Sequence, residues 1–410
     1  MVKVCDAIMG TGKSQSAIAY MNEHKDRKFI YITPYLDEAA RIKNGCPDLH
    51  FMEPSRKLSE YGFSKSRHTI ALIQEGKNVA TTHQAFKFYT AETLKYIREQ
   101  GYVLIIDENV DVLEQFNLSL GDLKILMDAG HVTKSGDYYT LANDDYTGVA
   151  LGELVRLLKS RDLIKIADVK KEKYYFWALP VDLITSFREV FILSYLFEGQ
   201  SLHHFLEMNN IPYEYIGIKR TKDGGYRFSE STEYVPEYVN HLGDMINIID
   251  KPKLNDVGDN YYALSMNWFS KNESDVEQLK NNIYNCFNNI WDDSPVGERM
   301  WGSYNNMSVK LRGRGYTNGF LTFNTKATNE YRDKKSLVYC ANIFMNVQEK
   351  LFYQNHGIDV SEDLYALSVM VQWIWRSAIR DGQKINLYIP SRRMRTLLEE
   401  WISSLVTQRK

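Results

Sequence analysis

The chain has 410 residues, a formal net charge of −2 at pH 7, 44% hydrophobic residues and 13% aromatic residues. This length suits two domains of ordinary size, and the balanced charge excludes the overall basic field that many nucleic-acid binders carry. No apolar run approaches the roughly 18–20 residues of a membrane span, and the first motif starts almost at Met1, so neither a membrane protein nor a signal peptide is expected. The cysteines form no Cys-x-x-Cys pair, which indicates reduced thiols in a cytoplasmic protein. They are Cys5, Cys46, Cys286 and Cys340.

A phosphate-binding loop is the first pattern in the chain. Residues 2–14 read Val-Lys-Val-Cys-Asp-Ala-Ile-Met-Gly-Thr-Gly-Lys-Ser, a short strand, a glycine-containing turn and the start of a helix. Its backbone N–H groups and the helix N-terminus would hold phosphate, Lys13 would reach the β- and γ-phosphates, and the Ser14 hydroxyl would ligate Mg²⁺. A tight turn that contains Gly-Lys-Ser by chance is the alternative. The nucleotide-binding residues are predicted to be Gly10, Thr11, Gly12, Lys13 and Ser14, with ATP and Mg²⁺ as the ligands.

Strands alternate with helices in the following segments. Residues 27–35 read as a buried strand that ends at Pro34, since proline forces an extended residue before it and stops the ladder. Further strands are expected at 78–82 and in the apolar run that ends at Asp107, with helical patterns between them. This alternation predicts a parallel sheet that is covered by helices on both faces.

Two carboxylates follow the last of these strands. Asp107 and Glu108 stand at its carboxyl end, where open α/β sheets place their ligands. Asp107 would hold Mg²⁺ through its water shell, and Glu108 would be the general base for the water that attacks the γ-phosphate. Carboxylates also cap strands at protein surfaces, but the preceding phosphate loop favours the catalytic interpretation.

The remainder of the first half does not continue the alternation of strands and helices. Residues 111–180 are expected to form a mostly helical insertion with a turn or hairpin at 134–147, or to be structural filler. The first lobe then resumes with a strand that ends at Ser194 and a helix that runs through residue 205.

The second half, 206–410, repeats the alternation. Strand candidates include 245–249 and 261–265, and a helix is expected at 275–291. Lys310, Arg312 and Arg314 lie within five residues and alternate with glycines. This segment is either a flexible basic loop that contacts phosphates or a solvated hairpin tip, and the sequence favours neither.

A strongly apolar helix is expected at 364–380. Gln372, Arg376 and Arg380 recur every four residues in it, so they would share one helix face. Three aligned polar groups are not required to fold such an apolar helix, which favours a functional role. A solvated stripe with the same spacing is the alternative.

In this order, the segments resemble a superfamily 2 helicase of the DEAD/DEAH type, most closely the compact forms found in phages and prophages. Residues 7–14 look like motif I, 107–110 like motif II and 191–194 like the coupling motif III, which implies a coupling role for Ser194. Residues 372–380 resemble motif VI, which implies that Arg376 and Arg380 act as arginine fingers with Gln372 beside them. By the same resemblance and the basic loop, the residues expected to contact nucleic acid are Thr33, Pro34, Thr81, Thr82, Arg312, Arg314 and Thr328.

The sequence departs from the family pattern at several points. Ala7 replaces the first glycine of motif I, a variant common in helicase-type ATPases. Asn-Val follows the motif II carboxylates, Ala-Thr does not follow Ser194, and the two arginines are four residues apart where three is common. The glutamine motif that reads adenine in DEAD-box proteins is not expected before the phosphate loop.

We therefore predict an α/β protein of two RecA-like lobes, 1–205 and 206–410, with parallel sheets covered by helices and ATP between the lobes. The predicted function is an ATP-dependent helicase that moves along or unwinds DNA or RNA in phage replication or recombination. Single-stranded DNA is the favoured partner and RNA the alternative, no membrane is involved, and the chain is compatible with a monomer. A non-unwinding translocase, a terminase-like packaging motor and a nucleotide-gated binding scaffold are the alternatives. The second half shows no cluster of acidic residues like that of a terminase nuclease domain.

Overall fold

The computed structural model describes residues 1–34, 36–55, 57, 64–116, 120–143, 145–160, 162–169, 172–323 and 330–407. They form two compact units. The first comprises Met1–Ala7, Gly12–Tyr234 and Asn346–Val360, and the second comprises Ile8–Thr11, Val235–Met345 and Ser361–Lys410. The units therefore do not divide between residues 205 and 206 as expected, because the strands that follow residue 205 pair or pack with the first unit.

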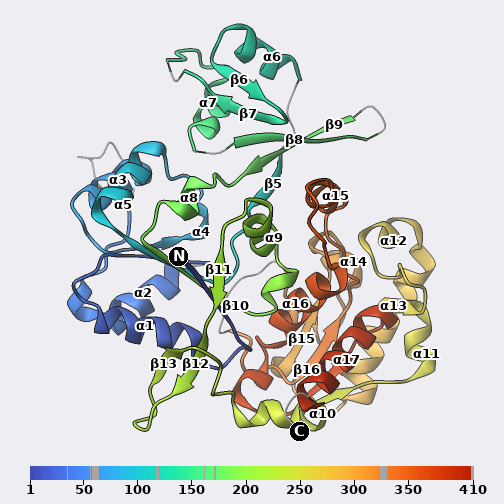
Figure 1. The fold of residues 1–410 in the computed structure, drawn as a ribbon. Helices are drawn as coiled ribbons and strands as arrows, with labels where there is room; N and C mark the ends of the chain where they lie inside the picture. Colours follow the sequence, from blue (N-terminus) through green and yellow to red (C-terminus); the bar gives the residue numbers. More distant parts are fainter. Residues whose placement is uncertain are drawn as a thin grey trace. The chain divides into compact units, whose positions relative to one another are not determined.

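The first unit is built on a six-stranded sheet in which every pair of neighbours is parallel (Figure 1). In sheet order its strands are β11 (Tyr213–Tyr215), β1 (Val2–Asp6), β10 (Glu189–Ser194), β4 (Val103–Asp107), β2 (Phe29–Thr33) and β3 (Val79–Thr82). Because neighbouring strands run in the same direction, the carboxyl ends of β1, β10 and β4 meet at one edge. The predicted strands of the first lobe are confirmed.

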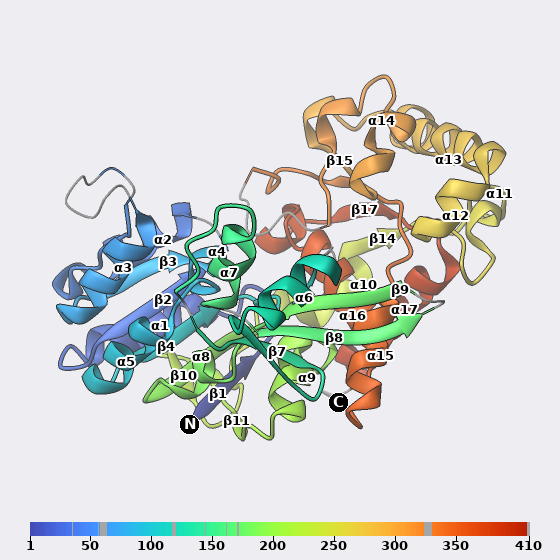
Figure 2. The same ribbon diagram turned by 90° about the horizontal axis from the view of Figure 1, so that it is seen from above.

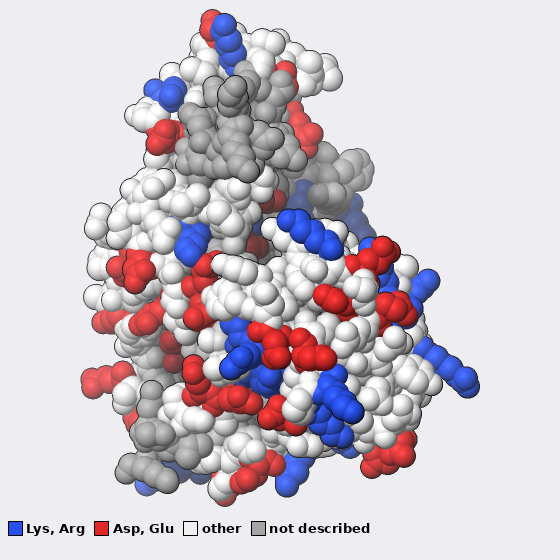
Figure 3. Space-filling view, turned by 90° about the vertical axis from the view of Figure 1, so that its right-hand side faces the viewer, with Lys and Arg blue, Asp and Glu red and all other residues white. Residues whose placement is uncertain are grey.

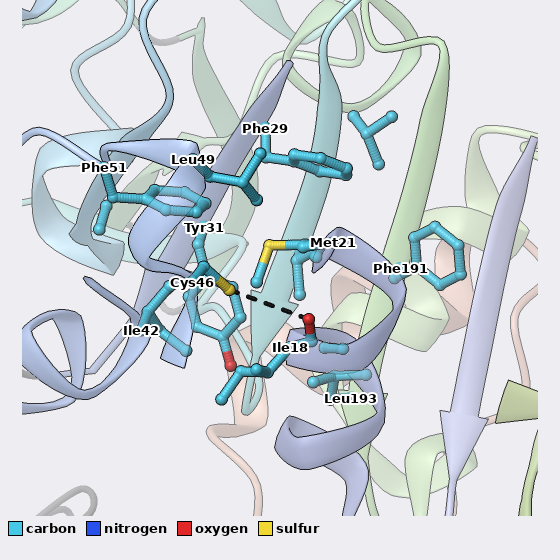
Figure 4. Close-up of a cluster of buried hydrophobic side chains, with 14 of the residues drawn as sticks. Ile18, Met21, Phe29, Tyr31, Ile42, Cys46, Leu49, Phe51, Phe191 and Leu193 are labelled. Atoms are coloured by element: carbon cyan, nitrogen blue, oxygen red, sulfur yellow. Dashed lines mark hydrogen bonds between the residues drawn. The ribbon is translucent and has the colours of Figure 1, made fainter. Parts of the chain in front are cut away.

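Helices bury both faces of this sheet. They are α1 (Lys13–Glu23), α2 (Leu36–Gly45), α3 (Lys65–Gln74), α4 (His83–Phe86), α5 (Ala91–Gln100), α8 (Asp182–Thr185) and α9 (Ser201–Met208), and the unit also contains α15 (Val347–Asn355). Figure 4 shows Ile18 of α1 and Ile42 of α2 in one core with Phe29 and Tyr31 of β2. Ile30, which points to the other face of β2, is also fully buried. This two-sided burial explains the continuous apolar runs of the sequence.

The expectation of a mostly helical insertion is wrong. This region holds a five-stranded antiparallel sheet with the order β5 (Leu113–Phe116), β9 (Glu172–Ala178), β8 (Asp162–Val169), β7 (Tyr138–Leu141) and β6 (Val132–Ser135). Two helices, α6 (Leu120–Asp128) and α7 (Gly152–Leu158), pack on it. Tyr139, Tyr175 and Trp177 are buried in its core, and such aromatic residues favour pleated strands over helix. The hairpin β6–β7 overlaps the turn or hairpin expected at 134–147.

Residues 206–234 join the first unit through β11 and an antiparallel hairpin. β11 pairs in parallel with β1, and the antiparallel hairpin of β12 (Gly217–Arg220) and β13 (Tyr226–Ser229) packs against α1 (Figure 1). Phe228 of the hairpin stacks on Phe191 of β10, with ring centroids 5.2 Å apart. The hairpin is thereby attached to the core of the first sheet.

The second unit contains a four-stranded parallel sheet with the order β14 (Ile246–Ile248), β17 (Ile385–Tyr388), β16 (Ser336–Tyr339) and β15 (Arg299–Gly302). Its helices are α10 (Leu242–Met245), α11 (Pro252–Asn255), α12 (Met266–Lys271), α13 (Glu273–Asn285), α14 (Ser308–Leu311), α16 (Glu362–Ile374) and α17 (Arg392–Thr407). Figure 2 shows α13 on one side of the sheet and α16 and α17 on the other. Accordingly, Val338 packs in a hydrophobic cluster with Leu279 and Ile283 of α13. On the other side of the sheet, the ring of Tyr339 contacts the ring of Trp373 of α16.

The two parallel, helix-covered sheets confirm the predicted α/β class with two RecA-like lobes. One strand candidate of the second lobe is wrong, because residues 261–265 form turns in which Leu264 has a φ of 61°. Cys5, Cys46, Cys286 and Cys340 are buried and free of disulfides, as expected. Among the described residues, no helix combines the length and apolar character needed to cross a membrane.

Candidate active site

The loop between β1 and α1 has the conformation of a phosphate cradle. Gly10 and Gly12 have φ angles of 86° and 91°, in the left-handed region that favours glycine. Gly12 is the N-cap of α1, and its carbonyl accepts the first helical hydrogen bond from Ser16 at 2.8 Å. Thr11 is fully buried and donates its hydroxyl to the Ile8 carbonyl at 2.8 Å. The loop therefore continues directly into the N-terminus of α1. The free backbone N–H groups at a helix N-terminus favour the binding of anions.

Lys13 stands at the first turn of α1 and lies against the loop. Its Nζ donates to the Ala7 carbonyl at 2.5 Å. Desolvation lowers the pKa of Lys13, and the nearby Cys5 and Asp107 oppose that shift. A polyanion at the loop would stabilise the charged ammonium in the same way.

Asp107, the last residue of β4, is the centre of the polar contacts. The Ser14 hydroxyl donates to its Oδ2 at 3.0 Å, and the Tyr31 hydroxyl donates to the same oxygen at 2.5 Å. Arg41 of α2 lies 3.7 Å from Oδ2 through its Nη2. Burial raises the pKa of Asp107, while the hydrogen bond from Tyr31 and then the charge of Arg41 lower it. A carboxylate beside a hydroxyl is an oxygen donor set that suits Mg²⁺, with phosphate oxygens and water as further ligands.

Glu108 leaves the sheet in a strained conformation. Its φ is 64°, which non-glycine residues rarely adopt, and its N–H donates to the Leu193 carbonyl of β10 at 3.1 Å. The residue is partly exposed, unlike the buried Asp107 before it. The turn thus directs two adjacent carboxylates into different environments, and strain of this kind is common at functional sites.

The carboxyl end of β10 is tied to the phosphate loop. The Ser194 carbonyl accepts a hydrogen bond from the Ala7 N–H at 3.1 Å, and its hydroxyl donates to Gln200 Oε1 at 2.8 Å. One turn further on, the Phe197 N–H donates to Asp6 Oδ2 at 3.1 Å. A displacement of Ser194 would therefore also displace Ala7, at the point where β1 continues into the phosphate loop.

The helix that carries the predicted arginine fingers ends earlier than expected, so its three polar residues do not share one helix face. α16 ends at Ile374, where i→i−3 bonds replace the helical pattern. The Ala378 N–H then donates to the Lys334 carbonyl at 2.9 Å, outside any helix. As a result Gln372 is partly buried on α16, Arg376 is buried beyond its end, and Arg380 is exposed in a 3-10 turn.

The residues predicted to contact nucleic acid on the first unit fall into two groups. Thr33 and Thr81 are fully buried, so their side chains present no exposed surface to nucleic acid in this conformation. Pro34 and Thr82 are partly exposed, and Thr82 accepts the Ala85 N–H as the N-cap of α4. Thr82 also lines a surface pocket of about 190 Å³. The other lining residues are Lys65, Ser66, Thr69, Ile70, Gln84, Ala85, Phe88, Tyr89 and Thr93.

On the second unit, Arg312 and Arg314 are exposed in the segment after α14. The segment is anchored, because the buried Arg299 donates to the Gly315 carbonyl at 3.1 Å and Tyr316 donates to the Leu311 carbonyl at 2.8 Å. Thr328 lies outside the described residues. On the face drawn in Figure 3, basic and acidic side chains are interspersed. Any basic contact surface on this face is therefore local.

The structure adds two groups that the sequence interpretation missed. They are Tyr31 of β2 and Arg41 of α2, both of which contact Asp107. Tyr31 pairs with Ile105 across β2 and β4, which brings its side chain to the carboxyl end of β4. Alternation along β2 could have indicated its face, but the partner depends on strand order, and the sequence does not carry that information.

Three comparisons show which known proteins this chain is similar to. The chain is 38% identical over 415 residues to the SPbeta prophage-derived uncharacterized protein YonV of Bacillus subtilis (strain 168), and the match covers 98% of this chain and 99% of that protein. Residues 240–402 match the family described as the YonV C-terminal Rossmann-like domain. Among solved structures, S. tokodaii Xpd4 is similar with a TM-score of 0.47 and 14% identity, covering 98% of this chain and 94% of that one. An XPD helicase structure has the same TM-score with 10% identity and covers 99% and 95%.

Proposed function

The chain belongs to the family of the prophage protein YonV, and we propose that it is an ATP-driven motor of the helicase type that acts on nucleic acid. The observation that carries this proposal is the contact of Ser14 with Asp107 at 3.0 Å, at the meeting point of the phosphate loop and β4. A hydroxyl and a carboxylate in this arrangement are the parts that phosphate-loop NTPases use to hold Mg²⁺.

The loop residues would bind the triphosphate. The N–H groups from Gly10 to Ser14 would donate hydrogen bonds to its oxygens, and Lys13 would exchange its bond to the Ala7 carbonyl for the β- and γ-phosphates. Ser14 and Asp107 would hold Mg²⁺, which neutralises charge on the phosphate oxygens when bound. These assignments rest on two features. The left-handed glycines Gly10 and Gly12 suit a loop that binds the triphosphate, and the buried carboxylate of Asp107 suits the bound Mg²⁺.

Glu108 would position the attacking water and accept its proton. Its partial exposure suits a group that must reach solvent, and its strained backbone turns it away from the buried Asp107. Arg376 and Arg380 would supply positive charge to the transition state from the second unit. Ser194 would link the phosphate loop to the movement of the motor, because its carbonyl accepts the Ala7 N–H.

Nucleic acid would contact both units. On the first, Pro34 is partly exposed, and the pocket beside Thr82 offers hydroxyl groups, the Gln84 amide and the Lys65 ammonium to phosphates. On the second, Arg312 and Arg314 offer exposed charge. Contacts of this kind hold the backbone without reading bases, so single-stranded DNA is the proposed partner and RNA the alternative. The prophage relative supports a prophage origin, and the proposed role is in phage replication or recombination.

The test is the rate of ATP hydrolysis with no polymer, with single-stranded DNA, with duplex DNA and with RNA. We expect stimulation by a single strand, loss of turnover in Lys13→Ala, and retained ATP binding without turnover in Glu108→Gln. Equal turnover in Glu108→Gln and wild type would contradict the catalytic assignment. Strand-separation assays then distinguish a helicase from a non-unwinding translocase, and nucleotide-dependent binding without any turnover would identify a scaffold.

A further inference from the structure

An aromatic ring lies directly against the phosphate loop. A Cβ atom at Gly12 would stand 2.3 Å from Cδ1 and 2.5 Å from Cγ of Tyr226, far inside van der Waals contact. Tyr226 begins β13, whose partner β12 and neighbour α1 belong to the same unit. Position 12 therefore requires glycine for two reasons, its left-handed backbone and the ring above it.

Two further side chains complete a cluster with this ring. Tyr234 meets Tyr226 with ring centroids 5.6 Å apart, and the Arg220 guanidinium lies 5.4 Å from the centroid of Tyr234 and 6.0 Å from that of Tyr226. Both tyrosines are partly exposed and Arg220 is exposed. We call Arg220, Tyr226 and Tyr234 the aromatic platform.

The backbone holds the aromatic platform in place. Arg220 and Tyr226 are directly opposite in the β12–β13 register, and the Tyr234 N–H donates to the Ile218 carbonyl at 3.1 Å. A Cβ at Gly217 would lie 1.8 Å from the Ser231 carbonyl carbon, so the segment after the hairpin returns in close contact with β12. The three side chains are thus held by backbone contacts on both sides of the hairpin.

We propose that the aromatic platform binds the base of the nucleoside triphosphate. This inference rests on the proposed function, because the phosphates must first occupy the loop that contains Gly12. A base is joined to those phosphates through a single ribose, so it must come to rest on a surface beside the loop. Tyrosine rings and an arginine guanidinium are the groups on which planar bases stack. A purine offers the larger face and is the expected preference.

The experiment measures binding of ATP, CTP and inorganic tripolyphosphate, each with Mg²⁺, to wild type and variants. Wild type should bind ATP more tightly than CTP, and both more tightly than tripolyphosphate. Tyr234→Ala and Arg220→Ala should each weaken ATP binding by about tenfold and leave tripolyphosphate binding unchanged. Tyr234→Phe, which keeps the ring, should retain ATP affinity. Arg156→Ala is the matched control, because Arg156 lies 5.8 Å from the ring of Phe88 in another part of the unit.

The outcomes separate this inference from the function on which it rests. A wild type that binds neither ATP nor tripolyphosphate overturns both. A wild type that binds ATP no more tightly than tripolyphosphate overturns the aromatic platform alone. The same conclusion follows if Tyr234→Ala and Arg220→Ala, shown to be folded by thermal unfolding, match the ATP affinity of Arg156→Ala, or if they lose ATP and tripolyphosphate affinity alike.

Discussion

At the scale of single residues, the buried carboxylate of Asp107 is stabilised by groups from several elements. A buried carboxylate is costly unless its oxygens accept hydrogen bonds or face positive charge. Ser14, Tyr31 and Arg41 meet this need from three different elements. Tyr31 is therefore a positioning residue, since its hydroxyl would orient the carboxylate toward a cation without touching the nucleotide.

Removing that hydroxyl should change the Mg²⁺ requirement. We expect Tyr31→Phe to raise the Mg²⁺ concentration for half-maximal ATP hydrolysis about tenfold, because groups behind a metal ligand set its orientation. Tyr102→Phe is the control, since it removes the hydroxyl of another buried tyrosine, just before β4, which donates to the Lys77 carbonyl at 2.7 Å. Both variants should lower the free energy of unfolding by about 1–3 kcal/mol. An unchanged Mg²⁺ requirement in Tyr31→Phe would exclude the positioning role.

At the scale of elements, the early end of α16 changes how the two arginines should be compared. On one continuous helix, Arg376 and Arg380 would have been near-equivalent neighbours. The break after Ile374 instead leaves Arg376 buried and Arg380 exposed. A buried guanidinium is expensive to maintain, and it is retained where it meets a partner or serves a function.

Arg376→Ala should reduce polymer-stimulated ATP turnover by at least roughly a hundredfold, with ATP affinity little changed, because an arginine finger acts on the transition state. Arg380→Ala should reduce this turnover clearly less than Arg376→Ala does. Arg376→Lys keeps the charge but loses the planar fork, so it should restore only part of the rate. Thermal unfolding checks that the variants are folded. If both alanine variants keep turnover within about twofold of wild type, neither arginine is a finger.

The contact of α15 with α9 gives a second prediction at this scale. Glu349 of α15 accepts a hydrogen bond from the Ser201 hydroxyl, and burial raises its pKa above the ordinary glutamate value, while the Ser201 bond lowers it and the charge of Asp111 raises it further. A raised pKa in the folded state means that folding favours the protonated acid. The associated stability is fully present below the unfolded pKa and is lost as pH rises through the folded pKa.

Glu349→Gln should therefore gain stability relative to wild type as pH rises from about 5 to about 8, measured by urea unfolding. The control is Glu153→Gln, which removes an exposed carboxylate and should shift stability equally at every pH. A wild type that becomes more stable than Glu349→Gln with rising pH would contradict this prediction.

At the scale of the whole molecule, the charge balance limits how nucleic acid can bind. A net charge of −2 provides no general attraction for a polyanion, and the face in Figure 3 mixes both signs. Affinity must then come from a few local contacts, each of which releases counterions.

The log–log salt slope of single-strand binding measures these contacts. Replacing Arg312 and Arg314 with alanine should reduce the slope by about 1.4 between about 50 and about 200 mM salt, because each phosphate contact on a single strand contributes about 0.7. Arg156→Ala, in the insertion, serves as the control and should leave the slope unchanged. An unaltered slope in the double variant would remove the 312–314 segment from the interface.

The sequence by itself determined the features that neighbouring residues encode. The phosphate loop is continuous from β1 to α1, and its glycines, lysine and serine are recognisable without any partner. Strands β2, β3, β4 and β10 of the first sheet were predictable because burial on two faces produces continuous apolar runs, whereas β15 of the second sheet was not predicted. The carboxylates after β4 followed from the same pattern, since a strand end is a local feature.

Only the tertiary structure decided how distant segments meet. Tyr31 reaches Asp107 because β2 and β4 are neighbours, which depends on strand order. α16 ends at Ile374, where i→i−3 bonds replace the helical pattern before the Ala378 N–H bonds to the Lys334 carbonyl of another segment, whereas the local apolar pattern continued the helix. The insertion is mainly sheet because its short antiparallel strands bury aromatic residues against one another. Tyr226 covers Gly12 for the same kind of reason, since a hairpin more than two hundred residues later in the chain packs against α1. Such contacts are fixed by packing over the whole unit, and no local pattern encodes them.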